Sequence, residues 1–287
     1  MKLFINIIIF ALAFFSCNET ASKKVYKPQS SGNINSLLVV VDDDLWGASV
    51  GEAIRRHIGS EIYGLPQIEP QFDLRQVPKS VFSDFVRMNR TVLKVQLSNE
   101  DGVKFYTNPY AKPQKMIVIS GTSRKILAEL IEQNSSKIIS VFKNEELKER
   151  QRRIKKSLFN TAAVEKTLGV TLNVPSVYRI AKKEKDFFWI RRDTKTGIIN
   201  LLLYSVPLQE FKSKDAFSQR VIQLRDSVAK QHIPGPVDGN FMTTETAYTP
   251  FHFLQKLLIQ KFWKREVYGK LKAHLCQALL LIFLLKI

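Results

Sequence analysis

The sequence predicts an α+β protein with two α/β sandwich-like halves, mixed or antiparallel sheets and one long helix. Short apolar runs alternate with amphipathic stretches, which indicates strands and helices in turn. The segment Asp193–Gly197 has hairpin composition, so at least one strand pair is antiparallel. A hydrophobic content of 45% over 287 residues is enough for a packed core.

The N-terminal half spans residues 37–160 and begins with a buried strand at Leu37–Val41, which is a continuous apolar run. A short helix follows, because Ser49 and Glu52 have capping-box spacing. The other expected elements are an irregular extended stretch, a short helix and two strands, over residues 62–74, 80–89, 91–97 and 116–120.

A long helix closes this half, from a cap at Thr122 or Ser123 to about Leu158. Its apolar positions repeat with helical period and predict a buried stripe made of Ile126, Leu127, Leu130, Ile131, Ile138, Ile139 and Phe142. Residues 145–156 are densely charged. We interpret them as a solvated helix face, with a docking surface as the alternative.

The C-terminal half spans residues 161–252, after a division near residue 160. Three strands are expected at 177–180, 187–192 and 198–206, and the last two flank the hairpin turn. An amphipathic helix follows at 215–231, and a Pro/Gly loop at 232–239.

The chain begins with a secretory signal. A short basic start and an apolar run precede Ser16-Cys17, so we expect residues 1–16 to be a signal peptide and Cys17 the acylated first residue. Phe14 and Phe15 depart from a strict lipobox, which leaves cleavage at another site as an alternative. The apolar run is too short for a transmembrane helix, which needs about twenty residues.

Residues 17–36 are polar and suit a lipidated tether. The second cysteine, Cys276, cannot form an internal disulfide if Cys17 is acylated. The net charge of +18 favours an anionic membrane surface as a partner. We expect no nucleic-acid partner, because an exported protein rarely meets one.

Several short blocks of the sequence recur in a recognisable order. They are Leu45-Trp46 behind the first strand, Gly64-Leu65-Pro66, the segment from Glu69 to Leu74, Pro207, and the 232–239 loop followed by Met242 to Glu245. Together these blocks resemble a lipoprotein family of the Bacteroidota that is a domain of unknown function. The resemblance covers residues 35–250 and implies an envelope lipoprotein without a known activity.

The resemblance stops before residues 253–287. The family continues with a Gly-Leu-Trp-Glu segment and a Phe-Met-x-Gly-Pro-Phe segment, and both can be read from residues 261–281 in a shifted frame. We therefore interpret residues 253–287 as a frameshifted tail. We expect this tail, including Trp263 and the Leu279–Leu285 run, to lie outside the fold.

Two clusters at strand ends are candidate ligand sites. Asp42, Asp43 and Asp44 follow the first strand and are weak candidates for a hard metal cation. The alternative, which we favour, is a turn with solvated side chains. Residues 120–123 precede the long helix and offer backbone N–H groups to an anion, but a simple helix cap is the better interpretation.

The histidines and aromatic residues give no catalytic signature. No G-x-S-x-G or H-E-x-x-H motif is present, and we interpret His57 and His232 as structural. Trp46, Trp189, Phe187 and Phe188 are the residue types that stack on sugar rings. Strand alternation separates Phe187 and Trp189 from Phe188 and Ile190, and core packing on both faces is the alternative we favour.

These observations favour a non-enzymatic binding or scaffolding lipoprotein at the outer membrane, with no cofactor and an envelope protein or glycan as partner. The alternative is an envelope hydrolase that acts on glycan or lipid. The sequence identifies no catalytic residue and leaves the ligand, and the face of the membrane, open.

Overall fold

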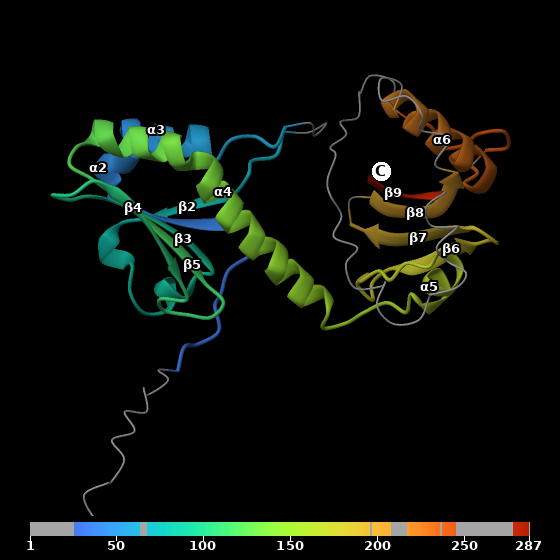
Figure 1. Cartoon of the computed structure of the whole chain (residues 1–287), viewed down its shortest axis with the longest axis horizontal. Helices are drawn as coiled ribbons and strands as arrows, with labels where there is room; N and C mark the ends of the chain where they lie inside the picture. The colour runs from blue at the N-terminus through green and yellow to red at the C-terminus, as the bar shows by residue number, and fades with distance from the viewer. Residues whose placement is uncertain are drawn as a thin grey trace, which may run out of the picture.

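The computed structural model has the predicted α+β class, with one mixed sheet, one antiparallel sheet and one long helix (Figure 1). It describes residues 26–63, 68–195, 197–207, 217–235, 237–244 and the backbone of 278–286. The predicted signal peptide, Cys17, Gly64-Leu65-Pro66 and Trp263 lie outside the described residues.

The sheet of the N-terminal half has the strand order β2-β1-β3-β5-β4. The first four strands in this order are parallel, and β4 forms an antiparallel edge against β5. The strands are β1 (Ser36–Val40), β2 (Asp73–Val77), β3 (Thr91–Leu97), β4 (Gly102–Thr107) and β5 (Lys115–Gly121).

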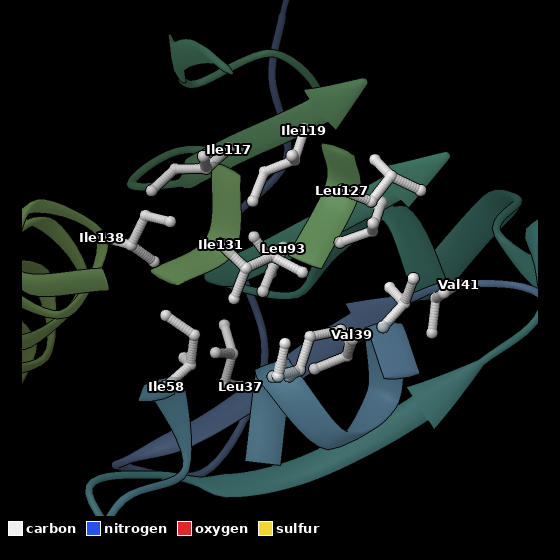
Figure 2. Packing of buried hydrophobic residues seen from close by; sticks show 14 of the residues in the cluster. Leu37, Val39, Val41, Ile58, Leu93, Ile117, Ile119, Leu127, Ile131 and Ile138 are labelled. Atoms are coloured by element: carbon white, nitrogen blue, oxygen red, sulfur yellow. The ribbon is translucent and has the colours of Figure 1, made fainter. Parts of the chain in front are cut away.

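Helices cover one face of this sheet. They are α2 (Asp43–Trp46), α3 (Ser49–Ala53), a π-helical turn (Ile54–Ile58) and α4 (Arg124–Ile154). Figure 2 shows strand side chains such as Leu37, Leu93 and Ile117 facing Leu127 and Ile131 of α4, and all five are fully buried. Burying each such aliphatic side chain stabilises the fold by about 1.5–3 kcal/mol.

The opposite face is covered by two short 3₁₀ helices, Lys79–Val81 and Asp84–Met88, where we expect one short helix. Phe82 and Val86 from this segment pack on strand residues of β1, β3 and β5. The two faces of the sheet are therefore both apolar, which explains why β1 is a continuous apolar run.

The long helix begins as predicted. Ser123 is its N-cap and accepts a hydrogen bond from the Ile126 N–H at 3.3 Å. The helix ends at Ile154 rather than near Leu158. The predicted stripe faces the core. Four of its members are fully buried, namely Leu127, Ile131, Ile138 and Phe142, and the other three, Ile126, Leu130 and Ile139, are half-buried at its margin.

The solvated face predicted for residues 145–156 is wrong for three glutamates. Glu145, Glu146 and Glu149 are buried. Glu146 accepts two hydrogen bonds from the buried Arg90 guanidinium, each 3.0 Å long. Glu149 accepts hydrogen bonds from Arg152 and Arg153, 2.6–2.8 Å long, which hold its pKa down. Helical periodicity could not reveal these contacts, because the buried cation Arg90 lies just before strand β3, outside the helix.

The chain before β1 packs against the N-terminal half, although we expect tether up to residue 36. The Lys112 N–H donates to the Pro28 carbonyl at 2.9 Å, and the Ser31 N–H donates to the Met88 carbonyl at 2.9 Å. Arg90 donates to the Asn33 carbonyl at 2.8 Å. Residues 28–35 are therefore part of the fold.

The C-terminal half is a sheet with the order β6-β7-β8-β9 and a helix on each face. All strand pairs are antiparallel, and β7 and β8 form the predicted hairpin. The elements are α5 (Ala162–Leu168), β6 (Arg179–Lys183), β7 (Phe187–Thr194), β8 (Gly197–Pro207), α6 (Phe217–His232) and β9 (Ala278–Lys286).

Strand β9 lies in the predicted tail. We expect residues 253–287 outside the fold, but Ala278–Lys286 pairs with residues 199–207 of β8, so this expectation is wrong for that segment. An unpaired β8 would leave a row of free N–H and C=O groups, and the backbone of β9 supplies the partners for them.

Three further elements differ from expectation. Strands β2 and β4 were not predicted, because both are polar edge strands whose burial is too weak to impose a clear apolar pattern. The Ser49 capping box is absent, because Ser49 is itself the first helical residue and Ala48 takes the cap position.

Candidate functional site

A pocket of about 600 Å³ lies in the C-terminal half, between the sheet and the loop that follows α6. Its floor is formed by Trp189 and Arg191 of β7 and by Ile198 and Asn200 of β8. These side chains alternate along their strands, so they share the sheet face that α6 covers. The volume is in the range of pockets that hold small ligands.

The wall of the pocket is the predicted Pro/Gly loop and its continuation, residues 233–242. Pro234 and Phe241 form an antiparallel bridge, and the Gly235 N–H donates to the Asn240 carbonyl at 2.7 Å. Gly239 has a φ of +84°, a conformation that favours glycine. The loop is thus a closed hairpin-like turn that presents Asn240 and Phe241 to the pocket.

A second contact fixes the end of this loop to α6. Asp226 of the helix accepts hydrogen bonds from the Thr244 N–H at 2.9 Å and from the Thr244 hydroxyl at 2.7 Å. The wall therefore has two anchors, its own turn and the helix. A wall held in this way loses little conformational entropy when a ligand binds.

The polar groups of the floor are linked to one another. The Trp189 Nε1–H donates to Asn200 Oδ1 at 2.8 Å, and the Asn200 residue is 2% exposed. This bond fixes the indole ring and leaves the Asn200 amide NH₂ as the donor of that side chain. The Arg191 guanidinium lies 5.9 Å from the centre of the Trp189 ring.

Arg191 also makes an ion pair with Asp193. Hydrogen bonds from Arg191, and then from Arg179 at 3.3 Å, hold the pKa of Asp193 below its ordinary value. The Nε–H of Arg191 is buried and has no hydrogen-bond partner among the described residues. Such a donor carries an energetic cost until an acceptor reaches it.

The described lining contains no Asp, Glu, His, Ser, Thr or Cys. It provides aromatic and aliphatic surface, one cation and two amides. The residue before the lining residue Ile233 is His232, which pairs with Glu184, and their Nδ1 and Oε2 atoms lie 2.7 Å apart. His232 is stacked on Phe187 at 4.1 Å, so the pair attaches the end of α6 to the sheet.

Glu184 has a further partner in Lys182, at 2.8 Å. This contact and the neighbouring His232 lower the pKa of Glu184. His57, the other histidine of interest, lies in the π-helical turn of the N-terminal half. The structure therefore does not bring the two histidines together.

The aromatic residues singled out in the sequence are also separated. Trp46 packs at the edge of the N-terminal core, with the Arg55 guanidinium 4.8 Å from its ring centre. Phe187 and Phe188 are 3% and 0% exposed, on opposite faces of the sheet as strand alternation predicts. Trp189 alone of these four residues lines the pocket.

Each carboxylate of the predicted metal cluster has a protein partner. Lys79 pairs with Asp42 at 2.9 Å and lowers its pKa. Gln76 donates to Asp43 at 2.8 Å, and Arg124 pairs with Asp44 at 3.1 Å. The described part of the chain holds no group of three or more His, Cys, Asp or Glu side chains arranged for a metal.

The predicted anion position before α4 is occupied by the protein itself. The Thr122 N–H donates to the Asp101 carboxylate at 2.7 Å, and Ser123 caps the helix. Both observations fit the helix-cap interpretation. Cys17 lies outside the described residues, and within those residues no helix is long and apolar enough to cross a membrane.

The fold is that of a two-part α+β protein with a concave site in its second part. Residues 30–155 match a family model described as Domain of unknown function (DUF8532), and residues 157–269 match Domain of unknown function (DUF4837). The chain thus carries two domains of unknown function. No curated protein and no solved structure matches it.

Four lining residues were missed by the sequence interpretation: Arg191, Asn200, Asn240 and Phe241. Strand alternation gives a signal for Arg191, because it is two residues from Trp189 and must share its face. Nothing in the sequence places Asn240 or Phe241 opposite this strand, since the contact depends on how the loop folds back.

Proposed function

We propose that this chain is a non-enzymatic binding protein, attached to the outer membrane through a lipid on Cys17, and an envelope lipoprotein of the kind found in the Bacteroidota. Its ligand is a small ring-containing acid, of which an acidic sugar of an envelope glycan is the best fit. The carrying observation is the pocket that places Arg191 beside Trp189 and Asn200.

Three features support this ligand class. Trp189 and Phe241 offer ring faces on which a sugar ring stacks. Asn200 and Asn240 supply amide groups for hydroxyls. Arg191 supplies a cation on the floor of the pocket, and a carboxylate would pair with its guanidinium by a charge-assisted hydrogen bond.

The test is calorimetric titration of the full chain with a glucuronic-acid oligosaccharide and a glucose oligosaccharide of equal length. We expect the acidic ligand to bind at least about tenfold more tightly, because a hydrogen bond to a charged group contributes about 1.5–3 kcal/mol. Arg191→Gln should remove this preference.

Arg179→Gln is the matched control, because Arg179 also pairs with Asp193 but does not line the pocket. It should bind both ligands as the parent chain does. Equal binding of the two oligosaccharides by the parent chain, or equal loss in the two variants, would contradict the proposed ligand class.

A second candidate, hydrolysis of envelope glycan or lipid, is favoured by the His232–Glu184 pair beside the pocket. A carboxylate that orients a histidine is one component of a general base. This candidate predicts that the chain releases reducing ends or fatty acids from envelope extracts and that His232→Asn abolishes the release. We expect no release from either protein.

A further inference from the structure

We infer that the N-terminal half rests directly on an anionic bilayer through a surface at the amino ends of its parallel strands, which we call the amino-edge surface. It consists of Tyr26, Lys27, Phe85, Arg87, Tyr110 and Lys112. The inference rests on the lipid anchor proposed above, and its occupant is the headgroup region of the membrane that carries the anchor.

Three segments meet to form this surface. They are residues 26–31, the 3₁₀ segment 79–89 and the loop 108–115, and hydrogen bonds hold them side by side. The Lys112 backbone N–H donates to the Pro28 carbonyl at 2.9 Å, and the Gln114 side-chain amide donates to the Asn89 carbonyl at 2.7 Å. Figure 1 shows the start of the described chain leaving this end of the sheet.

Aromatic and apolar groups are unusually exposed here. Phe85 is 75% exposed, Tyr26 is 87% exposed and Tyr110 is 40% exposed. Tyr110 is held in place by Phe82, with ring centres 5.9 Å apart, and by the Arg87 guanidinium, 5.4 Å from its ring centre. Tyrosine and phenylalanine with basic neighbours are typical of surfaces that lie at a membrane interface.

The charge of the three segments complements an anionic membrane. They contain five basic residues and one acidic residue, Asp84. Lys79 is neutralised by Asp42, which leaves Lys27, Arg87, Lys112 and Lys115. Each basic residue near an anionic surface raises the affinity for the membrane by about tenfold or less. Strong binding therefore requires all four basic residues.

The position of the anchor makes this surface the one that faces the bilayer. Cys17 and Tyr26 are nine residues apart in the sequence, a distance of at most about 30 Å even when fully extended. Tyr26 belongs to the amino-edge surface itself. A lipid on Cys17 therefore holds this edge of the sheet close to the headgroups and raises its effective concentration there.

The test uses the full chain with Cys17→Ser and Cys276→Ser, so that no acyl chain contributes and no native thiol is labelled. Phe85→Cys carries an environment-sensitive fluorophore in one protein. Leu97→Cys carries it in the control, because Leu97 is 47% exposed at the opposite, carboxyl end of β3. The probes are vesicles of phosphatidylcholine alone and of phosphatidylcholine with phosphatidylglycerol.

We expect the label at position 85 to shift to the blue on the anionic vesicles only, and the label at position 97 to stay unchanged. Lys27→Glu with Lys112→Glu should weaken this response at least about tenfold. Lys125→Glu is the control for charge, because Lys125 lies in the first turn of α4 at the other end of the sheet.

An unchanged label at position 85, or an equal shift at position 97, would overturn the inference. A response that does not depend on phosphatidylglycerol would also overturn it, because the aromatic residues would then enter the bilayer without any attraction between the basic residues and anionic headgroups. Because the assay protein lacks Cys17, these outcomes are independent of whether the native chain is acylated.

Discussion

The guanidinium of Arg90 lies against the carboxylate of Glu146, with Nε–Oε1 and Nη2–Oε2 distances of 3.0 Å. Their side chains are 1% and 2% exposed. Glu146 also accepts the Asn35 N–H at 2.9 Å, and Arg90 donates to the Asn33 carbonyl at 2.8 Å. This buried ion pair therefore links the long helix to the start of β3 and to residues 33–35, which lead into β1.

This pair predicts a large and asymmetric mutational effect. Glu146→Gln leaves the buried Arg90 charge with only the more distant Glu149 carboxylate, 3.8 Å away, so the free energy of unfolding should fall by up to about 3–5 kcal/mol. Replacing both residues, with Arg90→Met and Glu146→Leu, should cost less than the single change. The control is Glu132→Gln, on the exposed side of the same helix. It should change the free energy of unfolding by less than about 0.5 kcal/mol. Denaturant unfolding measures all three.

The helix stripe gives a second prediction. Leu127 is fully buried between α4 and the sheet, whereas Leu130 is half-buried. Leu127→Ala should therefore lower the free energy of unfolding by about 2–5 kcal/mol, and Leu130→Ala by clearly less. Equal costs for the two variants would show that the helix is rotated from the position described.

Glu149 predicts a dependence of stability on pH. Hydrogen bonds from Arg152 lower its pKa from 4.5 to about 2. A carboxyl group whose pKa is lower in the folded chain than in the unfolded chain stabilises the fold when the pH is above the pKa of the unfolded chain. This stabilisation is lost as the pH falls from about 4.5 toward 2. The free energies of unfolding of the parent chain and of Glu149→Gln should therefore differ most at pH 7, and the difference should shrink as the pH is lowered. A difference that is constant with pH would contradict this account.

Acylation of Cys17 gives a prediction about the intact cell. Metabolic labelling with a fatty-acid probe should modify the parent chain and Cys276→Ala equally, and it should not modify Cys17→Ala. Equal labelling of Cys17→Ala would rule out the anchor. The amino-edge surface would then have to bind the membrane without the help of a lipid anchor.

Much of the fold could be predicted from apolar patterns. The runs at 37–41 and 116–120 and the hairpin at 187–206 correspond to β1, β5 and the β7–β8 pair, because each is buried on both faces. The polar edge strands β2 and β4 carry no such pattern. The pairing of β9 with β8 could not be predicted either, because it depends on a free edge that is visible only in the folded sheet.

The candidate site was harder to predict than the fold. Trp189 was singled out as a stacking residue, and its neighbour Arg191 shares its strand face by simple alternation. The other wall of the pocket depends on the Gly235–Asn240 turn and on the Thr244–Asp226 contact. These are tertiary contacts between residues that have no periodic relation, so the sequence gives no signal for them.

The most direct test of the proposed function is a crystal structure of the full chain soaked with a glucuronic-acid disaccharide. The account predicts a sugar ring between Trp189 and Phe241, with its carboxylate in hydrogen-bond contact with Arg191. A disaccharide bound elsewhere, or a pocket filled by the protein's own chain so that no ligand enters, would contradict it.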